Sequence, residues 1–165
     1  MTSADDVRFM EAALALARDA AVEGEVPVGA VVVHEGEIIA SGANRTEREH
    51  DPTAHAELVA LREAARTLGR ARLRGCTLFV TMEPCAMCAG AIVLARVDRV
   101  VFGAWDDKAG MAGSVADLLR HPRLNHRPEV RAGVEQEASA ALLRDFFTAR
   151  RGRASAVPDS STVDD

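Results

Sequence analysis

Short β-branched runs alternate with amphipathic helical segments along this chain, and the alternation limits its fold more than any other feature. Apolar residues three and four positions apart predict a helix over residues 5–23. Further helices are predicted at 52–68, 84–94, 115–120 and 135–151. Strands are predicted at 28–33, 38–40, 76–81 and 99–102, with 129–131 as a candidate fifth. This order predicts an α/β fold, a three-layer α/β/α sandwich around a mixed central sheet of about five strands.

The chain has the length of one domain, which we expect to cover residues 1–151. Residues 44–51 are expected to be a polar loop, and the small polar residues 152–165 a disordered tail. No apolar run of the sequence approaches the ~20 residues that span a bilayer. The first residues lack a basic segment followed by an apolar core. We therefore expect a cytoplasmic location and no membrane partner.

The residues with the clearest chemistry lie at the starts of two predicted helices. One contains His55-Ala-Glu57 and the other Cys85-Ala-Met-Cys88. The two cysteines are three positions apart, so they share a face of the first turn, where the helix dipole favours thiolates. His55 is also expected in a first turn, and it adds an imidazole to the two sulfurs. Three protein ligands leave the fourth position of tetrahedral zinc open, which is typical of a catalytic site.

Glu57 is expected to have a different role from His55. It lies two residues further along, about 200° around an ideal helix, so the two side chains do not share a face. We therefore interpret Glu57 as a general base acting on the water at the metal, not as a further ligand.

Two other interpretations of the cysteines are open. A Cys-x-x-Cys pair beside a strand–helix junction is also typical of a dithiol redox motif, but that interpretation leaves His55 and Glu57 unexplained. Alternatively, Cys76 could join Cys85, Cys88 and His55 in a four-ligand structural zinc site. Cys76 begins a predicted strand, however, and we expect it to be a small buried hydrophobic residue.

His55-Ala-Glu57 followed by Pro84-Cys-Ala-Met-Cys88 matches the H-x-E…P-C-x-x-C signature of zinc nucleobase deaminases. This signature and its chemistry are known from that superfamily, tRNA adenosine deaminases included, and are carried over rather than worked out from spacing. Over residues 7–151 the chain closely resembles the bacterial tRNA-specific adenosine deaminase family. The further matching stretches are 25–31, 44–45, 50–57, 60–62, 81–90, 99–104, 113–114, 121–122, 125–126 and 141–147.

The resemblance implies a cytidine deaminase-like fold and a role for each matching residue. His55, Cys85 and Cys88 would bind one Zn²⁺ per subunit. Glu57 would take a proton from the attacking water, pass it to N1 of a flipped adenine and assist the departure of ammonia. The residues implied to surround the base are Asn44 as a hydrogen-bond partner, Val28, Gly29 and Ala30 as pocket lining, and the Ala56 N–H and Pro84 C=O as partners of the base and its leaving amine.

Other matching positions are implied to contact the anticodon loop of a tRNA, which the family binds as a homodimer. These positions are Asp106, Lys108, His121, Asn125, Phe146, Phe147 and Arg150. The sequence departs from the family at Trp105 and Met111, which affects the details of these loop contacts. The expected function is hydrolytic deamination of adenosine to inosine at the wobble position of a tRNA anticodon.

The net charge of −5 argues against broad nonspecific binding of nucleic acid. Arginines nevertheless gather at residues 120–127 and at the end of the last predicted helix, and these could meet phosphates. The main alternative is a deaminase of a free base or nucleoside, such as guanine or cytosine, which shares the metal signature but needs no such arginines. A third interpretation, a non-catalytic RNA-binding subunit that keeps zinc, predicts a missing proton shuttle, whereas Glu57 is present.

Overall fold

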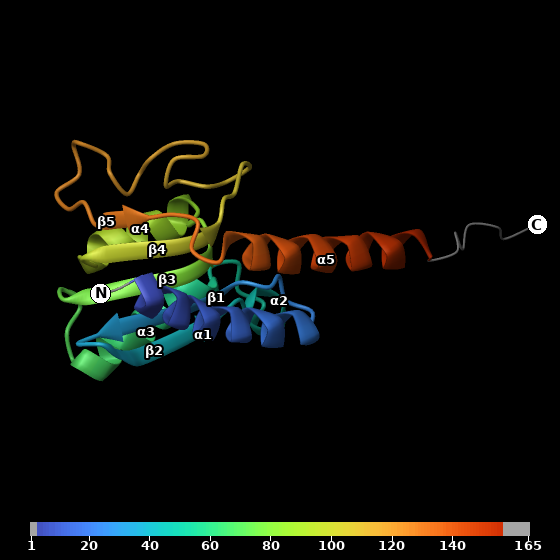
Figure 1. Ribbon diagram of the computed structural model, residues 1–165, viewed down its shortest axis with the longest axis horizontal. Coiled ribbons are helices and arrows are strands. Elements are labelled where there is room, and N and C mark those ends of the chain that lie inside the picture. Colours follow the sequence, from blue (N-terminus) through green and yellow to red (C-terminus); the bar gives the residue numbers. More distant parts are fainter. Residues whose placement is uncertain (1–2, 157–165) are drawn as a thin grey trace, which may run out of the picture.

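A five-stranded mixed sheet forms the centre of the computed structural model, which describes residues 3–156 (Figure 1). The strand order is β2-β1-β3-β4-β5. β1 is antiparallel to both β2 and β3, whereas β3, β4 and β5 are parallel to one another. The strands are β1 (Gly29–His34), β2 (Glu37–Ala43), β3 (Cys76–Met82), β4 (Arg99–Ala104) and β5 (Glu129–Arg131). The predicted sheet of about five strands is confirmed, including its short fifth strand.

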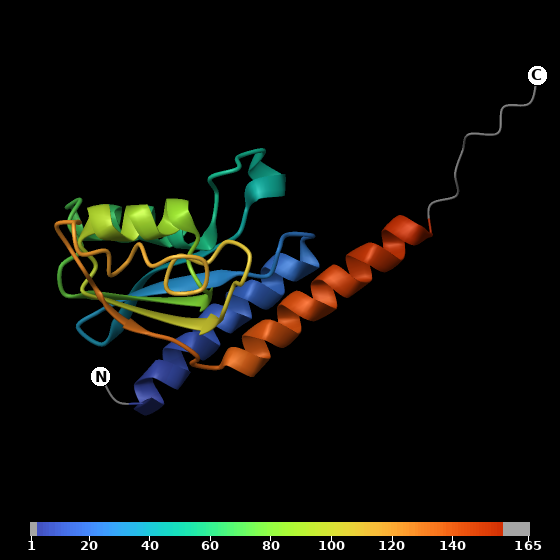
Figure 2. The same cartoon turned by 90° about the horizontal axis from the view of Figure 1, so that it is seen from above.

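Two layers of helices cover the sheet and give the predicted α/β/α sandwich (Figures 1 and 2). One face carries α3 (Ala56–Leu68) and α4 (Ala86–Ala95), and the other carries α1 (Ser3–Val22) and α5 (Gln136–Ser155). Alternate residues of β1 divide between the two layers because successive strand side chains point to opposite faces. Val32 packs into the core under α3 and α4, whereas Val31 and Val33 pack against α1.

Glycines let two helices lie very close to the sheet. A Cβ atom on Gly29 would lie 2.0 Å from the Ala13 carbonyl oxygen of α1, and one on Gly42 would lie 2.4 Å from the Ala56 carbonyl oxygen of α3. A side chain at either position would therefore push a helix away from its strand. The approach at Gly42 matters most for function because α3 begins beside the predicted metal ligands.

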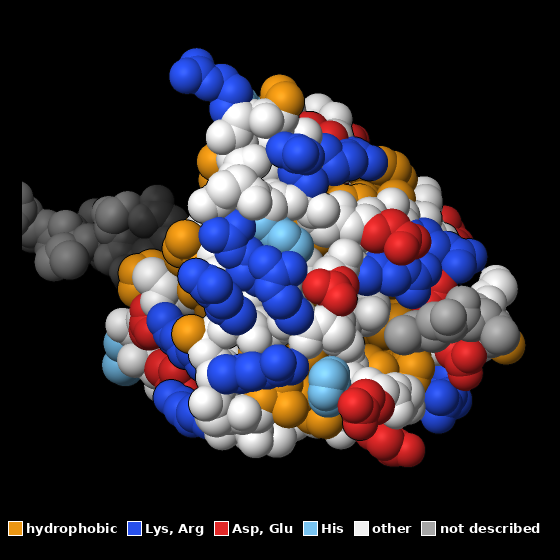
Figure 3. Space-filling view, turned by 90° about the vertical axis from the view of Figure 1, so that its left-hand side faces the viewer, with side chains coloured by type: hydrophobic (Ala, Val, Ile, Leu, Met, Phe, Trp, Pro, Cys, Tyr) orange, Lys and Arg blue, Asp and Glu red, His pale blue; other side chains and the backbone are white. Residues whose placement is uncertain are grey.

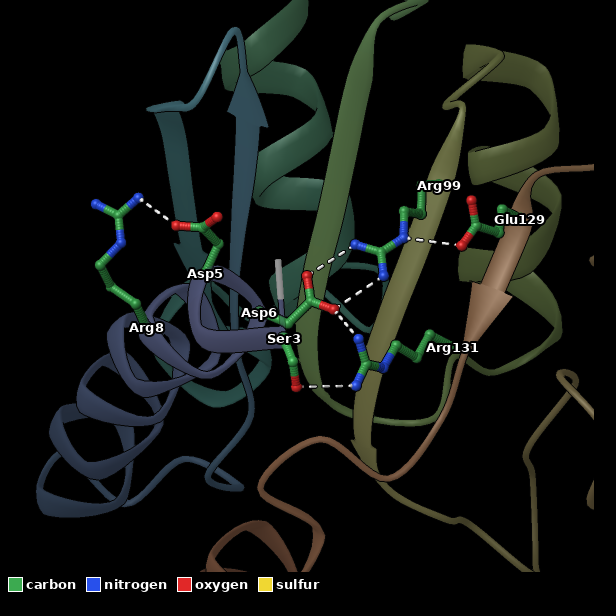
Figure 4. Close-up of polar contacts among 7 residues, drawn as sticks. All are labelled: Ser3, Asp5, Asp6, Arg8, Arg99, Glu129 and Arg131. Atoms are coloured by element: carbon green, nitrogen blue, oxygen red, sulfur yellow. Dashed lines mark hydrogen bonds and ion pairs between the residues drawn. The ribbon is translucent and has the colours of Figure 1, made fainter. Parts of the chain in front are cut away.

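A buried ion network joins the start of α1 to the far edge of the sheet (Figure 4). The fully buried Asp6 carboxylate accepts two hydrogen bonds from Arg99 of β4, at 2.8 and 2.9 Å, and another from Arg131 of β5. The hydrogen bond from Arg99 lowers the pKa of Asp6 below its usual range, although burial acts in the opposite direction. Asp6 therefore stays ionised as a clamp between layers.

Three local predictions were wrong, two of them because side chains accept backbone N–H groups. The predicted loop 44–51 contains a short helix, α2 (Thr46–Glu49), because the buried Glu25 carboxylate accepts the Glu47 and Arg48 N–H groups. The helix expected from residue 52 begins at Ala56, because Asp51 holds Thr53 in a turn. Residues 115–120 form turns instead of a helix, with a bridge between Ala112 and Asp117.

The last helix is longer than predicted. α5 continues through Ser155, so the first residues of the expected disordered tail are helical, and the remainder, 157–165, lies outside the described residues. The far half of α5 runs past the body of the domain (Figure 2). Across residues 3–156, no helix combines the length and the apolar character needed to cross a membrane.

Candidate metal centre and catalytic cavity

The topology brings the two motif segments to one edge of the sheet. β2 and β3 run in the same direction because each is antiparallel to β1. The chain leaves both strands at this edge and enters α3 and α4, whose first turns follow. His55 and Cys85 are the N-cap residues of these helices, with extended backbones, and Cys88 lies in the first turn of α4. The sequence predicted that His55 and Cys85 lie inside the first turns of their helices. In the structure each lies one position earlier, at the N-cap.

His55, Cys85 and Cys88 form a compact set of metal donors. The Nδ1 atom of His55 lies 3.6 Å from the Cys85 Sγ atom and 3.5 Å from the Cys88 Sγ atom. Zinc bonds of about 2.3 Å to sulfur and about 2.0 Å to nitrogen, at tetrahedral angles, hold such atoms roughly 3.6 Å apart. The three donor atoms all lie within 4.8 Å of one another. The donor set therefore fits a tetrahedral zinc ion with one position left for another ligand.

Cys76 is not part of this set. It is fully buried, and its Sγ atom lies 3.8 Å from the His34 Nδ1 atom. Among the residues that the structure describes, His55, Cys85 and Cys88 are the one group of three or more potential ligands close enough to share an ion. This placement removes the four-ligand structural site and confirms Cys76 as a buried residue.

Close contact between the two thiols sets their pKa values apart. A hydrogen bond from the Cys88 thiol lowers the pKa of Cys85 to about 4; burial acts in the opposite direction, and His55 adds a smaller lowering effect. The same contact and burial raise the pKa of Cys88. The hydrogen bond to Cys85 also raises the pKa of His55. Cys85 is thus ready to bind a cation as a thiolate, and a divalent ion would balance the charge of a second thiolate at Cys88.

Glu57 lines the same cavity as His55 and Cys85 and is almost fully buried, at 4% exposure. Burial raises the pKa of Glu57 to about 7, although a hydrogen bond with Cys88 and the nearby His55 act to lower it. A carboxyl group with a pKa near neutrality can both accept and donate a proton at the pH of a cell. This is the property required of a residue that moves a proton twice in one reaction.

A cavity of about 240 Å³ opens over the donor set. Val28 and Asn44 both line it. The Asn44 amide oxygen accepts the Ala56 N–H at 2.9 Å, which leaves the Asn44 NH₂ group as the available donor. The Ala56 N–H predicted to hold the base is therefore already paired. The full lining is Val26, Val28, Asn44, Thr46, His55, Glu57, Met82, Glu83, Cys85, Asp106 and Ala109.

Two residues predicted to line the pocket do not line this cavity. Gly29 points its missing side chain at α1, on the opposite face of the sheet. Ala30 is fully buried in the core beneath α3 and α4. The two-residue period of a strand excludes Gly29 from the face used by Val28, which the spacing of the motif does not reveal. The Pro84 carbonyl oxygen accepts the Met111 N–H at 2.8 Å and keeps one lone pair for another donor.

Glu83 holds the loop over the cavity, a role that sequence reasoning missed. Its buried carboxylate accepts the N–H groups of Asp106, Ala112 and Ser114 at 2.9–3.0 Å, and the Ser114 hydroxyl as well. Burial raises the pKa of Glu83, but these hydrogen bonds outweigh it and leave the pKa below its usual value. A Cβ atom on Gly110 would lie 2.2 Å from this carboxylate, so the loop closes around it.

The residues predicted to contact RNA lie in different parts of the structure. Asp106 lines the cavity, but its carboxylate accepts the Lys108 and Ala109 N–H groups and shapes its own turn. Lys108 faces Phe147, which is 39% exposed, across a groove of about 400 Å³ that also contacts Leu143, Arg144, Thr148 and Arg151. All of these residues lie on the 105–110 loop or on α5.

A second groove, of about 340 Å³, separates α5 from the end of α1. Phe146 and Arg150 line it, and the Arg150 guanidinium lies over the Phe146 ring at 5.8 Å. His121 and Asn125 do not line the cavity or either groove. Asn125 instead accepts a hydrogen bond from Arg96 at the other end of α4.

Comparisons with known proteins agree with this site. The family model for the cytidine and deoxycytidylate deaminase zinc-binding region matches residues 3–104. A tRNA-specific adenosine deaminase of Bacillus subtilis (strain 168) is 49% identical over 142 residues, covering 86% of this chain and 88% of that protein. A solved structure from a study of A-to-I editing by tRNA:A34 deaminases at the wobble position of transfer RNA has a TM-score of 0.80 at 46% identity, covering 82% of this chain and 99% of the other. A guanine deaminase from Nitrosomonas europaea has a TM-score of 0.76 at 26% identity, covering 86% of this chain and 84% of the other.

Proposed function

The chain belongs to the cytidine and deoxycytidylate deaminase family, and we propose that it converts adenosine to inosine at the wobble position of a tRNA anticodon. The observation that carries the chemistry is the buried Glu57 carboxyl beside a His-Cys-Cys donor set at the floor of one cavity. Identity of 46–49% to tRNA adenosine deaminases, against 26% to the guanine deaminase, favours the tRNA substrate over a free base.

The residues of the cavity divide the work of the reaction. His55, Cys85 and Cys88 would hold one zinc per chain, which when bound lowers the pKa of a water at its open position toward neutrality. Glu57 accepts one proton of the attacking water and donates it to N1 of the base; it then takes the remaining proton from the hydroxyl that the water has become and passes it to the departing amine. Asn44 donates its NH₂ group to the base, and Val28 packs against it. A base in a single-stranded loop can leave its stack at low cost and enter such a cavity.

Contacts beyond the cavity favour RNA over a small molecule. The grooves beside α5 combine Phe146 and Phe147 with arginines. The groove at Phe147 also contains Lys108, whose loop contributes Asp106 and Ala109 to the cavity. An exposed aromatic ring can stack on an unpaired base, and a guanidinium can bind phosphate. A free nucleoside reaches only the cavity. On this proposal the enzyme acts in the cytoplasm, on tRNA, and the deaminase domain extends to the end of α5.

We propose that the enzyme is a homodimer that pairs through α4. Leu94 is 80% exposed, and it lies with Gly90, Val93, Leu118 and Leu124 around an apolar groove of about 470 Å³. An apolar surface of this kind favours a protein contact. The groove lies on the second half of α4, at the opposite end of that helix from the two cysteine ligands. Light scattering should report a dimer for the wild type and a monomer for Leu94→Glu, with zinc retained in both; a monomeric wild type would refute this pairing.

Substrate competition tests the proposed function. The zinc-loaded enzyme should deaminate an anticodon stem-loop with adenosine at the wobble position and leave free adenosine, guanine and cytidine almost untouched. Arg150→Glu with Arg151→Glu should raise KM for the stem-loop and weaken its salt dependence while zinc stays bound. Efficient, salt-insensitive turnover of a free base would instead support the small-molecule deaminase. Absence of turnover on every substrate, with zinc bound, would support a non-catalytic RNA-binding subunit.

A further inference from the structure

Five arginines gather at the end of the molecule farthest from the cavity, and we call this surface the arginine face. Figure 3 views that end and shows Lys and Arg side chains gathered near its middle. Arg70, Arg72 and Arg74 belong to the loop between α3 and β3, Arg96 follows α4, and Arg127 precedes β5. All except the half-buried Arg96 are exposed.

Hydrogen bonds between loops show that these arginines belong to one surface. The Leu73 N–H donates to the Ala95 carbonyl at 2.6 Å, which joins the first loop to the end of α4. The Gly75 N–H donates to the Asp98 carboxylate at 2.8 Å. The His126 Nε2 atom contacts the Val97 carbonyl at 2.6 Å and joins the third loop to the second. The arginine face is therefore built on a fixed frame.

The charge of this face is not balanced by local ion pairs. Within residues 3–156, none of the five arginines has a carboxylate within 4.0 Å. Their hydrogen bonds go to neutral oxygens instead: Arg70 donates to the Arg74 carbonyl, Arg96 to the Asn125 amide, and Arg127 to the carbonyls of Pro122 and Leu124. A chain with net charge −5 thus carries a cluster with an excess of positive charge, although the Asp98 carboxylate lies within it.

The face is too far from the cavity to share the same few nucleotides. The metal donors lie at the N-terminal ends of α3 and α4, whereas the arginine face lies at their C-terminal ends. α3 has 13 residues, so the two sites are roughly 20 Å apart. A nucleic-acid strand rising about 3.4 Å per nucleotide needs about six steps to cover that distance. An RNA that reaches both sites must extend well beyond the reactive loop.

We propose that the arginine face binds the phosphate backbone of tRNA outside the anticodon loop. Guanidinium groups bind phosphate through paired N–H donors, and arginines that lack a carboxylate partner are free to do so. The inference rests on the proposed function, because it takes the substrate to be a whole tRNA. It adds a second contact that favours a folded tRNA over an isolated hairpin.

Charge reversal tests the arginine face. Affinity of the zinc-loaded enzyme should be measured by fluorescence anisotropy for a whole tRNA transcript and for its anticodon stem-loop, between 50 and 200 mM KCl. Arg70→Glu, Arg72→Glu and Arg74→Glu together should remove about 2–3 from the slope of log Kd against log salt for the tRNA. Over this fourfold range of salt, the wild type should then lose roughly 16- to 64-fold more affinity than the variant. Stem-loop affinity should not change.

Single substitutions distinguish a loss of RNA binding from misfolding of the loop. The Arg72 side chain makes no hydrogen bond within the described residues, so Arg72→Glu should fold and should lower the tRNA slope by about 0.7–0.9. Arg18→Glu, an equal charge change at an exposed site of α1, is the matched control and should leave the slope unchanged. Unchanged tRNA binding in the triple variant, or equal weakening with tRNA and stem-loop, would overturn the inference. Failure of the proposed function looks different, because the wild type would then deaminate neither RNA.

Discussion

Glu83→Gln is the sharpest test of how the cavity loop is held. The carboxylate uses both oxygens: one accepts the Ala112 and Ser114 N–H groups, and the other accepts the Asp106 N–H and the Ser114 hydroxyl. Glutamine keeps only one oxygen, so its NH₂ group must face at least one backbone N–H. The Ser114 hydroxyl can turn and accept from the new NH₂ group, which leaves the Asp106 N–H as the donor without a partner.

The expected loss of stability follows from the hydrogen bonds that glutamine cannot make at position 83. A buried donor left unpaired costs about 1–3 kcal/mol, and a hydrogen bond to a charged acceptor exceeds a neutral one by about 1 kcal/mol. With part of the site open to water, we expect Glu83→Gln to lower the free energy of unfolding by roughly 2–5 kcal/mol. Asp106 lines the cavity, so turnover of the stem-loop should fall as well.

The lowered pKa of Glu83 predicts how its contribution to the free energy of unfolding changes with pH. The pKa of Glu83 is lower in the folded protein than the ordinary 4.5, so its stabilisation is present above pH 4.5 and is lost as pH falls through the folded pKa. Wild type and Glu83→Gln should therefore differ most at neutral pH and converge in acid. Urea unfolding of the zinc-loaded proteins measures both quantities. Glu63→Gln is the control, because the exposed Glu63 accepts only the Ser41 N–H and glutamine can replace it. A loss below 1 kcal/mol at neutral pH, or no convergence in acid, would refute the role given to Glu83.

Three further substitutions, with Cys76→Ala as a control, test the metal site and the packing of the helices on the sheet. Cys88→Ala should lose bound zinc by metal analysis and Cys76→Ala should retain it; zinc retained in both would remove the ligand assignment. Asp6→Ala leaves two guanidinium groups without their buried partner and should cost about 3–5 kcal/mol in denaturant unfolding, whereas a cost under 1 kcal/mol would mean that the clamp is dispensable. Gly42→Ala places a Cβ atom 2.4 Å from the Ala56 carbonyl, so it should destabilise by about 1–3 kcal/mol and reduce turnover by shifting α3; wild-type behaviour in both assays would contradict the close approach.

The sequence predicts the fold and the donor set because both depend on local patterns. Alternating strands and helices determine the layers, and Cys85-x-x-Cys88 can be recognised without coordinates. Helix starts were less predictable, since they depend on distant side chains. Glu25 caps a helix more than twenty residues further along the chain, and Asn44 takes the Ala56 N–H of α3.

Contacts across layers could not be read from spacing at all. Glu83 stands next to the zinc-ligand motif, yet its partners lie 23–31 residues further along the chain. Gly29 occupies a matching stretch of the family but serves the packing of α1. The arginine face joins loops that are distant in sequence, so only the structure reveals that its charges are neighbours.

The central claim, wobble adenosine deamination with Glu57 as the proton carrier, is tested most directly by sequencing. A tRNA transcript with adenosine at the wobble position is incubated with zinc-loaded wild type or Glu57→Gln, reverse-transcribed and sequenced, so that inosine reads as guanosine. The wild type should convert that single position, and Glu57→Gln should keep its zinc while losing at least the ~10²–10⁴-fold in rate that general acid–base catalysis supplies. Conversion by Glu57→Gln at the wild-type rate, or no conversion at the wobble position by the wild type, would contradict the account.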